Sequence, residues 1–152
     1  MTNAVLLDTS VLGLVTNPQQ SPQGIACSQW IRSLLLANVR VIIPEIADYE
    51  LRRELLRARR TRGIARLDAL AQTLEYLPLT TAAMRQAARS WADARQQGQP
   101  TAGDRMIDGD MILVGQALTL GIPPTALVIA TTNVRHLSRF VPAELWQTIQ
   151  PL

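Results

Sequence analysis

The sequence predicts an α/β fold in which a parallel sheet is covered by helices on both faces. Short apolar runs at residues 4–7, 39–43 and 127–130, with Arg40 the single charged residue among them, are typical of strands that are buried on both faces. Stretches with apolar residues at helical spacing alternate with these runs, as in folds that combine a parallel sheet with helices. The connections are too short to separate two domains, so we expect residues 1–152 to form a single domain.

Apolar residues at helical spacing predict the helices that lie between the strands. These helices are expected over residues 25–38, 45–60, 64–74, 81–97 and 108–120. Gly63 is a possible break or hinge between the second and third of them, and Gly98 and Gly121 are expected to end the last two. The other segments are a proline-containing loop over 16–24, a short extended piece over 75–79, a polar loop over 99–105, and a final segment over 146–151 after a short helical turn.

The composition argues against several classes of protein. No run of about 18 apolar residues is present, so no membrane span is expected. The first apolar run follows no basic region and is interrupted at Asp8, so no signal peptide is expected. Cys27 is the only cysteine, which leaves it no disulfide partner within these residues and fits a cytoplasmic protein. All 15 basic residues are arginines, which suit phosphate groups, although a compositional bias of the source genome explains the same choice.

Acidic and polar side chains follow the predicted strands. A carboxylate such as Asp8, inside an apolar run, costs free energy unless it is paired, hydrogen-bonded or bound to a cation. In open parallel sheets, functional sites form at the carboxyl ends of the strands. The side chains that this rule brings to one edge are Asp8 after the first strand, Glu50 in the helix entered from the second, Asp108 and Asp110 at the start of helix 108–120, and Thr131, Thr132 and Asn133 after the last strand.

Clustered carboxylates repel one another, and a divalent cation resolves that conflict. Oxygen ligands without a cysteine or histidine set favour Mg²⁺ or Mn²⁺. Such an ion holds a nucleophilic water and neutralises charge on a phosphodiester. The side chains of Thr9, Ser10, Thr131 and Asn133 are expected to orient the water or the ligands by hydrogen bonds.

Four segments support a family resemblance when they are taken together, although each is common by chance. They are LLDTSVL at residues 6–12, PEIADYEL at 44–51, DMILVGQAL at 110–118 and IATTN at 129–133. In this order and spacing the chain resembles the PIN-domain ribonucleases, which include the VapC-type toxins of prokaryotic toxin–antitoxin pairs. The resemblance covers nearly the whole chain. It implies a three-layer α/β/α sandwich with a parallel central sheet, and metal-dependent cleavage of single-stranded RNA.

The resemblance also assigns roles to individual residues. It maps the first three acids of the family onto Asp8, Glu50 and Asp110, as ligands of Mg²⁺ or Mn²⁺, and its fourth position onto Asn133. These four are the candidate catalytic residues. Asparagine at the fourth position departs from the four-carboxylate pattern and should weaken binding of a second metal ion, while single-metal catalysis stays open. Asp108 is a candidate for the missing charge.

Each acid also has a purely structural interpretation. Asp8 would cap a turn through backbone amides, and Glu50 would pair with Arg53 on a helix surface. Glu45 and Glu54 are rivals of Glu50 on the same helix.

The acids at the start of helix 108–120 have structural interpretations as well. They are expected there as caps or dipole partners; Asp108 suits the cap position, which leaves Asp110 free to face a metal ion. Asn133 also suits a tight turn. His136, the only histidine, is expected to be a surface or packing residue.

Arginines surround the predicted acidic edge. Seven of them fall between residues 52 and 66, beginning beside Glu50, and two more follow Asn133. An acidic metal centre needs cations around it to hold a polyanion, so candidate RNA contacts are Arg53, Arg57, Arg135 and Arg139. The alternatives are a solvated helix face, or a surface that receives an acidic segment of a protein inhibitor.

The leading functional hypothesis is that the protein is an endoribonuclease. Its possible partners are an antitoxin protein and a second copy of the chain. The alternative is a catalytically weak or inactive PIN-like module that binds RNA or a protein partner. A phosphoacceptor domain of flavodoxin-like type is disfavoured, because it predicts a lysine near the acceptor and the chain contains none.

Overall fold

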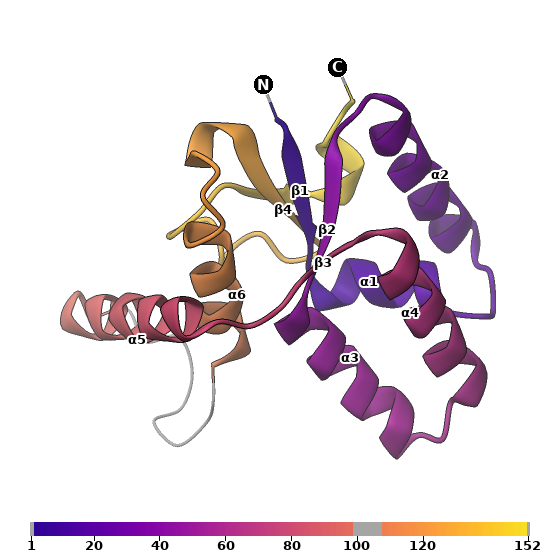
Figure 1. Ribbon diagram of the computed structural model, residues 1–152, viewed down its shortest axis with the longest axis horizontal. Coiled ribbons are helices and arrows are strands. Elements are labelled where there is room, and N and C mark those ends of the chain that lie inside the picture. The colour runs from indigo at the N-terminus through magenta and orange to yellow at the C-terminus, as the bar shows by residue number, and fades with distance from the viewer. Residues whose placement is uncertain (1, 99–107, 152) are drawn as a thin grey trace.

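Five parallel strands form the sheet of the computed structural model, which describes residues 2–98 and 108–151 (Figure 1). The strands are β1 (Ala4–Leu7), β2 (Arg40–Pro44), β3 (Glu75–Leu77), β4 (Leu127–Thr131) and β5 (Ala143–Leu145). Their order across the sheet is β3-β2-β1-β4-β5, and every neighbouring pair runs parallel. The predicted parallel sheet is confirmed, and β5 is an additional edge strand that the sequence pattern does not predict.

Strand β1 lies at the centre of the sheet. Val5 is in register with Val41 of β2 on one side and with Val128 of β4 on the other. Successive side chains of a strand point to opposite faces, so Val5 and Leu7 enter one core while Ala4 and Leu6 enter the other. All four residues of β1 are completely buried, which explains why its sequence is apolar without alternation.

Helices cover both faces of the sheet (Figure 1). They are α1 (Thr9–Thr16), α2 (Pro22–Leu36), α3 (Glu45–Arg57), α4 (Thr61–Thr73), α5 (Thr81–Gln96) and α6 (Gly109–Leu118), with 3-10 turns at Pro124–Ala126 and Trp146–Thr148. Helices α1, α2 and α4, with the apolar face of α3, pack on the Val5 side. Helices α5 and α6 pack on the Leu6 side. The three-layer α/β/α sandwich is confirmed.

The segment after β1 is helical where the sequence pattern predicts no element. Asp8 occupies the N-cap of α1 and Ser21 that of α2, where the Ser21 hydroxyl accepts a hydrogen bond from the Gly24 N–H at 3.0 Å. The predicted loop over residues 16–24 is therefore shorter than expected, because Pro22 fits the first turn of a helix as well as it fits a loop.

Gly63 is not a break or hinge, since it lies inside the first turn of α4. The chain reverses earlier, between α3 and α4, where Arg59 adopts a left-handed φ of 57°. A Cβ at position 63 would lie 3.0 Å from Leu55 Cδ2, so this glycine permits close packing of α3 and α4. Gly98 and Gly121 do follow α5 and α6, with positive φ values of 71° and 85°.

The predicted polar loop over residues 99–105 lies outside the described residues. None of the helices within residues 2–98 and 108–151 is both long and apolar enough to cross a membrane.

Candidate metal and nucleic-acid site

The ends of β1 and β4 and the starts of α1 and α6 surround an open cavity of about 350 Å³. We call it the acid cavity, and its lining residues are Asp8, Thr9, Ser10, Glu50, Asp110, Thr132, Asn133 and Leu137. The four residues predicted to be catalytic thus come from four separate segments and line a single cavity. This edge is the carboxyl edge of the parallel sheet, where the topology of such folds gathers loop residues.

Asp8 is held at the junction of β1 and α1. Its backbone N–H donates to the Ala130 carbonyl of β4 at 3.0 Å. Carboxylate oxygen Oδ1 accepts a hydrogen bond from the Thr9 N–H, and Oδ2 accepts one from the Thr131 hydroxyl, both at 2.7 Å. Asp8 therefore caps α1, as its structural interpretation predicts, and it also lines the acid cavity.

Glu50 is held by contacts from two other helices. The Thr9 hydroxyl of α1 donates a hydrogen bond to Glu50 Oε1 at 2.9 Å. At the start of α6, a Cβ placed on Gly109 would lie 2.4 Å from Glu50 Oε2, so the carboxylate occupies the space that a side chain at position 109 would need. The two alternative acids on α3 have other partners. Glu45 accepts a hydrogen bond from the Leu79 N–H at 2.6 Å, and Glu54 pairs with Arg57 at 2.9 Å.

Asp108 and Asp110 divide the roles expected of acids at a helix start. Asp108 is the N-cap of α6, and its side chain accepts a hydrogen bond from the Met111 N–H at 3.3 Å. Asp110 follows in the first turn and is half-buried in the lining of the acid cavity. Burial raises the pKa of Asp110, and the negative charges of Asp8, Asp108 and Glu50 raise it further, while His136 opposes them.

The segment after β4 is tied to the same junction. The Thr131 hydroxyl accepts a hydrogen bond from the Asn133 N–H at 3.0 Å, and the Ser10 hydroxyl accepts one from the Thr132 N–H at 3.3 Å. Thr131 is completely buried, whereas Asn133 is exposed and presents its side chain at the cavity. Thr9, Ser10 and Thr131 thus fix the backbone and carboxylate positions of this edge.

Within residues 2–98 and 108–151, no three acidic, histidine or cysteine side chains are arranged so that they hold a metal ion as they stand. Asp8 and Glu50 instead direct oxygens toward hydrogen-bond donors on Thr9 and Thr131.

The predicted RNA-binding arginines are not part of the lining of the acid cavity. Arg53, Arg57, Arg135 and Arg139 are all exposed, and none of them belongs to the described residues that line the acid cavity. The Arg53 guanidinium lies over the Tyr49 ring at 5.4 Å from its centroid, and the Arg139 guanidinium lies 5.7 Å from the Phe140 centroid.

Gly109 and Leu137 contribute to this site without having been predicted from the sequence. A signal for Gly109 is present in the Asp-Gly-Asp run over residues 108–110, because a glycine between two acids often marks a close approach of the backbone to another group. Leu137 has no such signal, since an apolar residue after a strand is common.

A model of the PIN domain family matches residues 5–141, and the chain belongs to this family. The family predicted from the four sequence segments is thereby confirmed. No curated protein sequence matches the chain.

Solved structures with the same fold come from VapBC complexes. The chain is similar to a chain of Rickettsia felis VapBC2 bound to a DNA fragment from their promoter (TM-score 0.70, 18% identity, covering 94% of this chain and 98% of that one). It is also similar to chains of DNA-bound VapBC from Salmonella typhimurium (0.68, 23%, 96% and 99%) and of VapBC-1 from nontypeable Haemophilus influenzae (0.70, 20%, 95% and 99%). These likenesses establish the PIN-like fold over nearly the whole chain.

Proposed function

We propose that this protein is a metal-dependent endoribonuclease that cleaves single-stranded RNA. The observation that carries the proposal is the convergence of Asp8, Glu50 and Asp110 on one cavity, where burial, and then the charges of neighbouring acids, raise the pKa of Asp110. Such a cluster is costly for the fold unless a ligand offsets its charge, which makes the acid cavity a candidate site for a cation. Membership of the PIN domain family supports a nuclease.

The donor set fits Mg²⁺ or Mn²⁺. It consists of carboxylates with an amide at its margin, without cysteine, and hard cations prefer oxygen ligands of this kind. Asp8, Glu50 and Asp110 would hold the ion, with Asn133 assisting. A bound divalent ion supplies charge neutralisation at a phosphodiester and lowers the pKa of water.

The other residues of the edge would position this set. Thr9 would orient Glu50 and Thr131 would orient Asp8, through the hydrogen bonds that they donate. Ser10 would hold the segment after β4, and Asp108 would hold the start of α6, which carries Asp110. Each of these groups acts through another side chain or through the backbone, so their loss should weaken ion binding without abolishing it.

Arg53, Arg57, Arg135 and Arg139 would contact the phosphates of the RNA. Their exposure supports this role, because a guanidinium group at the surface reaches a polyanion without losing a buried partner. Arg57 would have to exchange its ion pair with Glu54 for this contact.

A VapC-type role in a toxin–antitoxin pair is the biological context that we propose, with a protein antitoxin and homodimerisation. It is supported by the likeness of fold to chains of VapBC complexes. Its test is the neighbouring gene and the effect of expression on growth: a small DNA-binding protein that relieves growth arrest supports the role. Normal growth on induction of an active nuclease contradicts it.

Cleavage of single-stranded RNA with Mg²⁺, with Mn²⁺ and with EDTA tests the enzymatic proposal. Asp8→Asn should lower cleavage activity by more than the roughly 10–100-fold that is typical when an outer hydrogen-bond partner of a metal site is lost. The matched control is Glu54→Gln, which removes an acid from the same helix as Glu50, outside the acid cavity. Equal activity of wild type and Asp8→Asn, or no cleavage with either metal, contradicts the proposal.

A second candidate function is a PIN-like module that binds RNA or a protein without cleaving it. It is favoured by Asn133, which lacks the charge of a fourth carboxylate, and by the absence of a ready three-ligand arrangement among the described residues. RNA binding that persists in EDTA and survives Asp8→Asn, together with no cleavage, would support this function.

A further inference from the structure

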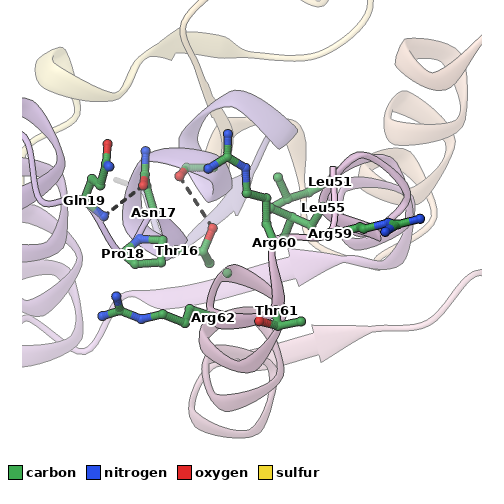
Figure 2. Close-up of a pocket in the computed structure, with 12 residues that line it drawn as sticks. Thr16, Asn17, Pro18, Gln19, Leu51, Leu55, Arg59, Arg60, Thr61 and Arg62 are labelled. Atoms are coloured by element: carbon green, nitrogen blue, oxygen red, sulfur yellow. Dashed lines mark hydrogen bonds between the residues drawn. The ribbon is translucent and has the colours of Figure 1, made fainter. Parts of the chain in front are cut away.

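A second cavity, of about 570 Å³, is lined by the residues drawn in Figure 2. The end of α1, the following loop, the second half of α3 and the start of α4 line it. Three of its lining residues are Arg59, Arg60 and Arg62, and we call it the arginine cavity. None of the described residues that line it is acidic. Its volume lies within the roughly 300–1,000 Å³ typical of sites for small molecules.

Six of the seven arginines between residues 52 and 66 fall into two groups, and the seventh, Arg53, lies over the Tyr49 ring. Arg52 pairs with Asp48 and Asp68, Arg57 pairs with Glu54, and Arg66 donates to the Val15 carbonyl. Each of these three guanidinium groups therefore has a partner within the chain.

Arg59, Arg60 and Arg62 form the second group. Within residues 2–98 and 108–151 they make no ion pair or hydrogen bond through their side chains. Three cations around a hollow without a carboxylate make a strongly positive site, which calls for an anionic ligand. In Figure 2 the Arg62 side chain extends on the same side as Pro18 and Gln19, whereas Arg59 extends to the opposite side.

The rest of the lining is mixed in a way that suits a nucleotide. Leu51, Leu55 and Pro18 offer apolar surface, against which the face of a base can pack. Asn17 and Gln19 offer side-chain amides that match the donors and acceptors on a base edge. The guanidinium groups of Arg60 and Arg62 match phosphate oxygens.

The two cavities share two helices. Helix α1 contributes Thr9 to the acid cavity and Gly13 to the arginine cavity, and helix α3 contributes Glu50 to the former and Leu55 to the latter. Four residues of α1 and five of α3 advance about 6 Å and about 7.5 Å, steps comparable with that between neighbouring phosphates of an extended strand. A strand with one phosphate at the acid cavity can therefore reach the arginine cavity with a nucleotide close to it.

We infer that the arginine cavity binds a nucleotide of the single-stranded RNA beside the phosphate held at the acid cavity. Arg60 and Arg62 hold its phosphate, and Leu51, Leu55 and Pro18 receive its base. The inference rests on the proposed function, because the same strand occupies both cavities. The cations of the arginine cavity would offset the repulsion between the acid cavity and a polyanion. The four exposed arginines predicted from the sequence lie outside the lining of the acid cavity.

The test is RNA binding in EDTA, measured by fluorescence anisotropy with a labelled oligouridylate on the full chain. Arg60→Gln with Arg62→Gln should raise Kd about tenfold. The slope of log Kd against log salt should fall by about 0.7, because the two arginines hold one phosphate and each neutralised phosphate of a single strand contributes about 0.7. The matched control is Arg85→Gln with Arg89→Gln, which removes two exposed arginines from α5 and leaves both quantities unchanged.

Arg60→Lys with Arg62→Lys provides a second variant that keeps the charge and loses the planar fork. It should weaken binding less than the glutamine pair. Circular dichroism confirms that each variant is folded.

Several outcomes overturn the inference. The inference fails if the glutamine pair has the Kd and salt slope of the wild type, or if the α5 control loses as much RNA affinity as the glutamine pair. It also fails if the wild type shows no saturable RNA binding. A peptide of alternating glutamate and leucine is the competing probe. If the glutamine pair loses affinity for this peptide and not for RNA, the cavity is a protein-docking site and the inference fails.

Binding in EDTA separates this inference from the proposed function. If the wild type cleaves no RNA while the glutamine pair still weakens RNA binding, the proposed function fails and the inference stands. If the wild type cleaves RNA and the glutamine pair has the same kcat/KM, the inference fails and the proposed function stands.

Discussion

The carboxylate of Glu50 occupies the space that a side chain at position 109 would need, and residue 109 is a glycine. A Cβ at position 109 would lie 2.4 Å from Glu50 Oε2 and 2.9 Å from Glu50 Cδ, distances that no real Cβ contact allows. These two residues are 59 positions apart in the sequence, on α3 and at the start of α6. Their contact brings Glu50 beside the turn of helix that carries Asp110, and so joins two of the three proposed metal ligands.

Gly109→Ala should therefore displace Glu50 from the acid cavity. The side chain of Glu50 is flexible, so the fold should survive, while Mn²⁺ affinity falls about tenfold or more, within the range found when a group that orients a metal ligand is lost. Isothermal titration with Mn²⁺ measures this without any cleavage.

Gly13→Ala is the matched control for that variant, because a Cβ at position 13 meets only Leu51 Cδ1 at an ordinary 3.8 Å. It should leave Mn²⁺ affinity unchanged and stabilise α1 by about 0.5–1 kcal/mol. Unchanged Mn²⁺ binding in Gly109→Ala would show that the close approach does not position Glu50.

Asp110→Asn should make the metal-free protein more stable while it removes metal binding. Burial and neighbouring acids raise the pKa of Asp110, so its ionised form is disfavoured in the folded state. An increase of about 2–4 °C in Tm at neutral pH is expected, which corresponds to roughly 1 kcal/mol for a chain of this size. Thermal denaturation in EDTA measures it, with the exposed acid change Asp93→Asn as control.

The sign of the pH dependence follows from the same pKa. A carboxyl group whose pKa is raised in the folded state binds more protons there than in the unfolded chain. Its stabilising contribution is complete below the ordinary pKa and is lost as the pH rises through the raised value. The difference in stability between Asp110→Asn and the wild type should thus shrink on acidification; a difference that grows at low pH contradicts this account.

Thr9→Val should loosen Glu50 without unfolding the chain. The substitution removes the hydroxyl that donates to Glu50 Oε1 and retains a side chain of similar shape. We expect Mn²⁺ affinity to fall about tenfold. Thr9→Ser, which keeps the hydroxyl, should restore most of it; failure of serine to restore affinity would indicate that packing of the methyl group, and not the hydrogen bond, is what matters.

Cys27 should be unreactive in the folded protein. It is completely buried in the core between α2 and the sheet, and burial raises its pKa from 9.0 to about 12. Because the thiolate is the reactive form, a thiol reagent at pH 8 should modify Cys27 only after unfolding in guanidinium chloride. Rapid modification of the native protein at that pH would place Cys27 at the surface and contradict the packing of α2.

Much of the site was predictable because its residues are attached to strands. Asp8 follows an apolar run and Asn133 follows another, and parallel topology alone sends both to one edge. Asp108 was identified as a cap for a similarly local reason, since caps depend on the first turn of their own helix. Helix α1 was not predicted because its N-cap is Asp8, which the sequence pattern marks as a site residue. Strand β5 was not predicted because three residues at a sheet edge are too few to show a periodic pattern.

The sequence by itself determined the layers of the fold and which side chains follow its strands. A strand that is buried on both faces requires apolar residues throughout, and the local sequence shows this pattern at residues 4–7 and 127–130. The tertiary structure decided the partners: Thr9 for Glu50, Thr131 for Asp8, and the empty side-chain space of Gly109. It also decided which arginines have partners within the chain and which line a cavity. Such choices depend on contacts between residues far apart in the chain, and no periodicity along the sequence records them.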